Sequence, residues 1–140
     1  MKILFAADGS QFTKKALAFL VTHESLCGPD DDLFVLNVQA PVPPRARSMV
    51  GASVVKSYHQ DEARKVLDPI ERFLKRHNLA FRTAWTVGPP APEVLAAIDR
   101  EKAQLVVMGT HGHGLIGRAL LGSVAQNVVA DCQVPLLLVK

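Results

Sequence analysis

Two patterns of apolar residues alternate along the chain. Five short apolar runs, bounded by polar or turn-forming residues, predict β-strands at residues 2–7, 33–38, 81–87, 105–108 and 134–139. Between them, apolar residues recur at three- and four-residue spacing, which predicts four helices, near residues 12–20, 63–74, 94–98 and 124–129. This alternation predicts right-handed βαβ units, and therefore a parallel sheet covered by helices on both faces.

Turn and cap residues refine these elements. Ser10 follows an Asp-Gly turn and is expected to cap the first helix, and Ser123 is expected to cap the last helix. Pro69 should kink the second helix or interrupt its hydrogen bonding. Pro135 lacks an N–H, which predicts that the last strand lies at an edge of the sheet.

Residues 39–53 show neither pattern. This stretch contains Pro41, Pro43, Pro44, Arg45 and Arg47, and it is longer than most connections in compact domains. Two interpretations remain: a lid over a site, or a surface loop without function.

Length and composition indicate one globular domain, residues 1–140. Hydrophobic residues make up 49% and charged residues 21% of the 140 positions, and the net charge of +3 is scattered at helical spacing. Such scattering argues against a nucleic-acid partner. No apolar run has the length of a membrane span or of a secretory leader, so we expect a cytoplasmic protein. Cys27 and Cys132 lack the spacing of a metal or redox motif.

The stretch from Gly109 to Ser123 has the composition of a phosphate cradle. Five glycines fall within the fourteen residues 109–122, between a predicted strand and a predicted helix. Glycine reaches positive φ at low cost and lets backbone N–H groups approach an anion, and the helix N-terminus adds partial positive charge. We expect the Ser123 hydroxyl and the N–H groups of Ser123, Val124 and Ala125 to bind phosphate oxygens. The alternative is a flexible loop followed by a capping serine.

Two common nucleotide motifs fit this stretch poorly. Residues 112–117 match GxGxxG, but a dinucleotide site also needs an acid after the next strand, and that strand ends at Lys140. A Walker A loop needs Lys and Ser or Thr after Gly117, where the chain has Arg118 and Ala119.

The spacing Gly109-x2-Gly112-x9-Gly122-Ser123 resembles the ATP-binding signature of the universal stress protein family. The resemblance covers the whole chain. It extends to the length, to the Asp8-Gly9-Ser10 turn, and to the segments Asn37-Val38, Gly88-Pro89, 107–112 and 134–139.

This resemblance implies an α/β fold: a single flavodoxin-like, three-layer domain with a five-stranded parallel sheet in order 3-2-1-4-5 and four helices. It implies an ATP-binding regulatory protein that forms a homodimer through its last strand, with neither nucleic acid nor membrane as partner. Val38 would contact the adenine, and residues around Asp8 would line base and ribose. The nucleotide-binding residues it implies are Ala7, Asp8, Val38, Met108, Gly109, Gly112, Arg118, Gly122, Ser123 and Val124.

Several residues keep a second interpretation. Asp8 is either a turn former that caps a helix or a contact to ribose or Mg²⁺, and Arg118 is either a phosphate clamp or a solubilising residue. His111 and His113 lack the partners of a metal site, so no metal ligands are expected in the protein itself. Tyr58 and Trp85 occupy positions expected to pack.

Catalytic residues are not expected. The sequence offers no nucleophile beside a base, and the glycine segment lacks the lysine that stabilises a phosphoryl transition state. Adenylating relatives carry an SGGxDS-type loop after strand one, whereas residues 6–10 are Ala-Ala-Asp-Gly-Ser. The alternative to a binding protein is a weak ATPase, with Mg²⁺ held by the phosphates and Asp8.

Overall fold

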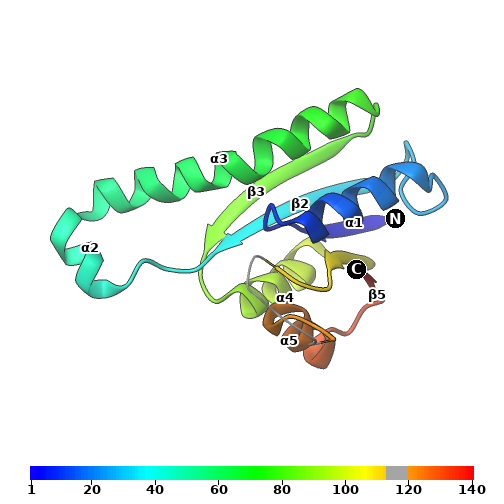
Figure 1. Cartoon of the computed structure of the whole chain (residues 1–140). Helices are drawn as coiled ribbons and strands as arrows, with labels where there is room; N and C mark the ends of the chain where they lie inside the picture. Colours follow the sequence, from blue (N-terminus) through cyan, green and yellow to red (C-terminus); the bar gives the residue numbers. More distant parts are fainter. Residues whose placement is uncertain (113–119) are drawn as a thin grey trace.

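Five parallel strands form one sheet in the order β3-β2-β1-β4-β5 in a computed structural model that describes residues 1–112 and 120–140 (Figure 1). The predicted strand order and the edge position of the last strand are confirmed. The bounds are β1 Lys2–Ala6, β2 Asp32–Gln39, β3 Phe81–Val87, β4 Leu105–Gly109 and β5 Leu136–Val139.

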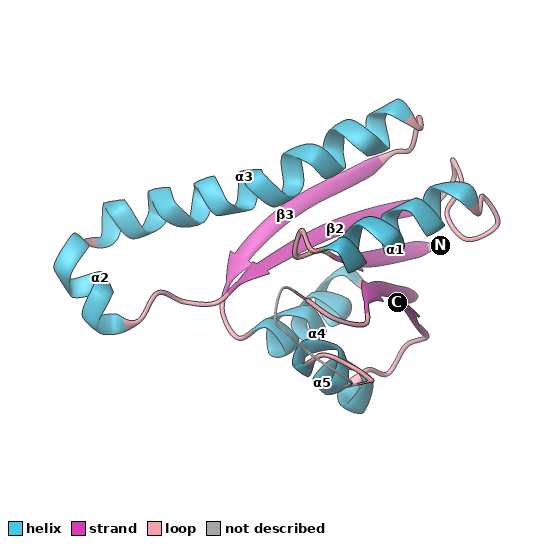
Figure 2. Ribbon diagram, in the orientation of Figure 1, coloured by secondary structure: helices cyan, strands magenta, loops and turns pink. Residues whose placement is uncertain are grey.

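Helices cover both faces of the sheet, with α1 and α3 on one side and α4 and α5 on the other (Figure 2). The prediction of four helices is wrong, because the described residues contain five. The helices are α1 Gln11–Thr22, α2 Pro44–Val50, α3 Ala52–Arg76, α4 Pro90–Glu101 and α5 Ser123–Asp131.

The additional helix, α2, lies within the predicted loop 39–53. It starts at Pro44, whose fixed φ suits the first turn of a helix, and ends at Val50, with Gly51 as its C-cap at φ +88°. None of its residues is buried, so no apolar periodicity marked it in the sequence. In Figure 1, α2 and the first turns of α3 extend beyond the sheet as an arm.

Alternating residues of the central strands fill two separate cores. Ile3, Phe5, Leu33 and Val35 face α1 and α3, whereas Leu4 and its neighbours on that face pack against α4 and α5. The strands β1 and β4 are buried on both faces along their continuous apolar runs.

Two sequence expectations about packing fail on α3 and β3. Tyr58 is 51% exposed and Trp85 is 36% exposed, because Tyr58 lies on the projecting part of α3 and Trp85 on the edge strand β3. Helix α3 also runs continuously through Pro69.

In the two described ranges, no helix is both long and apolar enough to cross a bilayer.

Candidate functional site

A cavity of about 570 Å³ opens at the carboxyl ends of β1, β2 and β4. Strand order reverses between β1 and β4, and open parallel sheets bind their ligands at such a switch point. The volume lies in the range of small-molecule sites. The chain therefore builds a ligand-sized cavity where its topology predicts one.

The predicted site residues meet in this cavity although they come from three distant parts of the chain. Arg118 lies outside the described residues. All the others line the cavity: Ala7, Asp8, Val38, Met108, Gly109, Gly112, Gly122, Ser123 and Val124.

Asp8 holds the turn that begins α1. Its Oδ1 accepts hydrogen bonds from the Ser10 N–H at 2.9 Å and from the Thr13 hydroxyl at 2.7 Å. The Asp8 N–H donates to Thr13 Oγ1 at 3.1 Å, and Ser10 caps α1 by accepting from the Thr13 N–H. Asp8 therefore holds this turn while Ser10 is the helix cap, and these bonds fix the Asp8 carboxylate at the cavity wall.

The glycines of residues 109–112 are required because other groups come close. A Cβ on Gly109 would lie 2.5 Å from Phe12 Cβ, and a Cβ on Gly112 would lie 2.6 Å from Asp8 Oδ2. Among the described glycines only Gly9 and Gly51 have positive φ, so of the two reasons for glycine, positive φ does not apply at Gly109 and Gly112. Glycine is needed at these two positions because Phe12 and Asp8 lie too close for a Cβ atom.

Gly122 joins the two ends of the glycine segment. Its N–H donates to the Thr110 carbonyl at 2.7 Å, and an added Cβ would lie 3.2 Å from His111 Cα. This contact holds the first turn of α5 against the end of β4, so both ends of the segment face one cavity.

Helix α5 starts one residue earlier than predicted. Gly122 is the N-cap, Ser123 is the first helical residue, and the cap makes no side-chain hydrogen bond. The prediction that Ser123 caps α5 is therefore wrong. The first hydrogen bond into the helix runs from the Gln126 N–H to the Gly122 carbonyl. The earlier N–H groups of Ser123, Val124 and Ala125 form the partly positive end of the helix, beside the cavity.

The cavity has an apolar end and a polar end. Leu36, Val38, Val94 and Met108 provide apolar surface, because even-numbered residues of β2 and β4 point toward α4 and α5. Thr110, His111 and Ser123 lie at the polar end. An apolar slot leading to a ring of N–H and O–H groups suits a flat heterocycle joined to an anion.

Sequence reasoning missed several lining residues: Thr13, Leu36, Ala40, Pro90, Val94 and Thr110. Leu36 lies two residues before Val38, so strand alternation alone was a signal for it. No comparable signal existed for Pro90 and Val94, which reach the cavity through the docking of α4.

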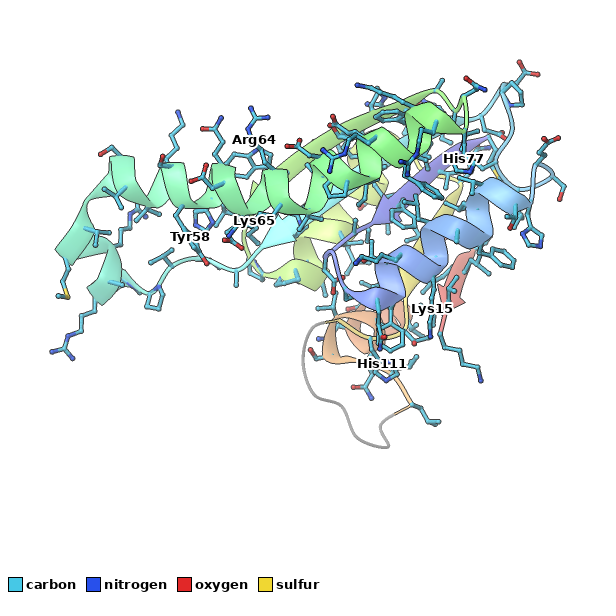
Figure 3. The ribbon with its side chains drawn as sticks, turned by 45° about the horizontal axis from the view of Figure 1, so that its top comes forward. Lys15, Tyr58, Arg64, Lys65, His77 and His111 are labelled. Carbon is cyan, nitrogen blue, oxygen red and sulfur yellow. The ribbon has the colours of Figure 1, made fainter. Side chains whose placement is uncertain are left out.

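His111 stands at the rim. Its Nδ1 lies 2.9 Å from the Thr110 hydroxyl, and its ring centroid lies 5.0 Å from that of Phe12 on α1. Figure 3 shows His111 close to α1, near Lys15. Within the described ranges, no three His, Cys, Asp or Glu side chains are grouped as metal ligands.

The chain matches the model of the universal stress protein family over residues 1–140. A universal stress protein of Thermus aquaticus, described as lying in the QAH/OAS sulfhydrylase 3' region, is 32% identical over 144 aligned residues. That match covers 99% of this chain and 97% of the relative.

Solved structures agree with the family match. Universal stress protein MJ0577 of Methanocaldococcus jannaschii superposes with a TM-score of 0.85 at 25% identity, covering 99% of this chain and 94% of that chain. The Archaeoglobus fulgidus universal stress protein in complex with dAMP has a TM-score of 0.71 at 20% identity, covering 100% and 98%. At that lower identity the likeness concerns the fold.

Proposed function

This chain belongs to the universal stress protein family, and from that premise we propose that it is a regulatory protein of the ATP-binding subgroup. Residues 1–140 would form one such domain. The observation that carries the proposal is the cavity at the switch point, where the Gly109–Gly122 signature meets Asp8 and Val38. The dAMP bound by the Archaeoglobus relative supports an adenine nucleotide as the ligand class.

The residues present suit ATP from base to phosphate. The adenine would lie in the apolar slot beside Val38 and Met108, with Ala7 and Asp8 at the base and ribose. Gly109 and Gly112 would allow the ribose and phosphates to approach the backbone.

The phosphates would bind at the start of α5. Gly122, the Ser123 hydroxyl and the N–H groups of Ser123 and Val124 would hold their oxygens, and Arg118 is proposed as a further phosphate contact. A Mg²⁺ ion would be held by the phosphates and Asp8.

The decisive experiment begins with the purified chain as isolated. Mass spectrometry of small molecules released on denaturation should detect an adenine nucleotide, and calorimetric titration should give a dissociation constant for ATP. ATP at about a hundred times that constant should stabilise the fold by about 2.7 kcal/mol. Recovering no nucleotide, together with no ATP-dependent rise in melting temperature, would sink the proposal.

A matched pair of serine variants tests the proposed contact between Ser123 and the phosphates. Ser123→Ala should weaken ATP binding roughly tenfold, because a hydrogen bond to a charged group is lost. Ser53→Ala, on the exposed first turn of α3, should bind ATP like the parent. Equal affinities in the two variants would show that the phosphates bind elsewhere.

We propose binding without turnover. At the polar end of the cavity the Thr110 hydroxyl lies 2.9 Å from His111 Nδ1, but Thr110 is only 6% exposed. Its buried hydroxyl suits a role in orienting the ring. The rate of phosphate release from ATP should therefore equal the rate measured in buffer without the protein. A faster release that His111→Ala abolishes would favour the weak ATPase instead.

A homodimer through β5 is also proposed. The Pro135 carbonyl accepts a hydrogen bond from Val106 of β4, and the Val139 carbonyl accepts one from Thr110, just after β4. Leu136 and Leu138 therefore turn their main-chain groups toward the open edge. Each of the four β5 side chains is partly exposed. An apolar edge strand of this kind is stabilised when a second copy covers it.

A further inference from the structure

A second cavity, of about 480 Å³, lies on the opposite face of the sheet from the ATP site. Asn37 and Gln39 are odd-numbered residues of β2, and odd-numbered residues of this strand face α1 and α3. We call this space the α3 cavity. Its lining outside the nucleotide site comprises Gly9, Asn37, Gln39, Tyr58, Glu62 and Lys65, together with Val66.

One face of α3 forms the outer wall of the α3 cavity. Tyr58 and Lys65 are seven residues apart, two helical turns, and Figure 3 shows them on one side of α3 with Arg64 on the other. A reciprocal pair of 2.7 Å hydrogen bonds fixes this wall to β2: Gln39 Nε2 donates to the His59 carbonyl, and Gln39 Oε1 contacts His59 Nδ1. The cavity is thus built by the fold and held in shape.

The floor of the α3 cavity contains an unpartnered acceptor. Asn37 is 3% exposed, and its Nδ2 donates to the Ala7 carbonyl at 2.9 Å. That bond turns the opposite side of the amide, Oδ1, away from β1. Oδ1 is buried and has no hydrogen-bond partner among the described residues. A buried acceptor without a donor costs about 1–3 kcal/mol, which a ligand N–H would recover.

The charged groups of the α3 cavity favour a cation. Glu62 brings a carboxylate and Lys65 an ammonium group. The carboxylate of Asp8, held by Ser10 and Thr13 at the strand end that both cavities share, makes the net charge of the lining −1 (two negative, one positive). Lys65 bonds Glu62 at 2.9 Å, but its side chain is 71% exposed, so this pair is weak and able to open. The half-exposed ring of Tyr58 adds a face that attracts cations.

We propose that the α3 cavity binds a small organic cation, a primary ammonium or guanidinium compound, whose N–H groups donate to Asn37 Oδ1 and to the Glu62 carboxylate. This site is additional to the proposed ATP site. The two cavities share only Asp8, Val38 and Ala40 at the strand ends between them.

Methylguanidinium chloride is a suitable probe, with N-methylurea as its neutral analogue of nearly the same shape. In amide-resolved NMR of the full chain, methylguanidinium should cause saturable shifts of the Asn37 side-chain amide and the Gly9 N–H. N-methylurea should bind at least severalfold more weakly, because it lacks the charge. Absence of saturable shifts, or shifts of equal size with both compounds, would overturn the proposal.

Variants locate the site. Glu62→Gln should weaken methylguanidinium binding roughly two- to fivefold, the value of one exposed ion pair. Glu24→Gln, on the exposed turn after α1, should leave it unchanged. Asn37→Leu should abolish binding, and Glu62→Gln provides the test if that core variant does not fold.

Shifts confined to Gly109 and Gly122 would place the cation in the nucleotide cavity and refute the α3 site. ATP affinity of Glu62→Gln should equal that of the parent, so this test and the ATP test fail independently.

Discussion

Gly109, Gly112 and Gly122 each lie against another part of the chain too closely for a side chain. The sequence pointed to all three residues and offered two reasons for glycine, positive φ and close approach; of these, close approach applies at the three positions. Their actual role depends on Phe12, Asp8 and the 110–111 backbone, which approach them only in the folded chain.

Replacing Gly109 should therefore lower stability even without nucleotide. In Gly109→Ala the new Cβ meets Phe12 Cβ at 2.5 Å and Phe12 backbone at 3.1 Å, which forces α1 from β4 and should cost about 1–3 kcal/mol. Gly88→Ala is the control, because its Cβ meets only the movable end of Glu93 and should cost less than about 0.5 kcal/mol. Urea unfolding measures both, and equal losses would contradict the close-approach argument.

The buried Cys27 thiol makes the stability of the folded chain depend on pH. Burial, and secondarily the charge of Asp31, raise the pKa of the Cys27 thiol above its ordinary value of 9.0. The folded chain therefore holds this proton more tightly than the unfolded chain. The resulting stabilisation is complete below the unfolded pKa, and it is lost as pH rises through the higher folded pKa.

Comparison of the parent with Cys27→Ala isolates that effect. Under reducing conditions, the difference between their unfolding free energies should be constant from about pH 5 to 7.5 and shift against the parent above about pH 8.5. Urea unfolding across this range provides the measurement. Parallel curves up to about pH 10.5 would show that the thiol is not perturbed.

At the scale of elements, burial decided which helices the sequence predicted well. Helices α1 and α4 bury a regular apolar stripe and were found. Helix α2 buries nothing, and the first turns of α3 are also exposed, so neither carried a periodic signal. Pro69 did not end α3, because Ile70 and Leu74 beyond it pack into the core under α1 and α3.

The two serines at helix starts should behave differently. Ser10→Ala removes the hydroxyl that caps α1 and should cost about 0.5–2 kcal/mol of unfolding free energy. Ser123→Ala removes no cap and should change stability by less than about 0.5 kcal/mol without nucleotide. Thermal unfolding of both variants in the nucleotide-free state makes the comparison, and a larger loss for Ser123→Ala would mean that it caps α5.

At the scale of the whole molecule, the open edge of β5 is the surface through which we propose that two copies of the chain associate. Leu138→Pro removes an outward N–H without removing a β4–β5 hydrogen bond, because the flanking residues face β4. This variant should sediment as a monomer, whereas Leu138→Ala, which loses similar packing but keeps the N–H, should stay dimeric. A dimeric Leu138→Pro chain would place the interface elsewhere.

The sequence patterns by themselves determined the parallel α/β class, the edge position of the last strand and the residues at the strand ends, whereas the strand order came from the family resemblance. Apolar runs alternating with periodic helices restrict the fold to a parallel sheet, and the Gly109–Ser123 spacing pointed to the strand-four end. These are local patterns, readable along the chain.

Only the tertiary structure decided what surrounds those residues. Thr13, Pro90 and Val94 reach the first cavity, and Asn37 and Glu62 share the α3 cavity, because separate helices dock on a twisted sheet. Exposed helices, close glycine contacts and an acceptor left without a donor depend on packing between distant segments. A one-dimensional pattern records which face of an element is apolar, but not which atoms of another element come to lie against it.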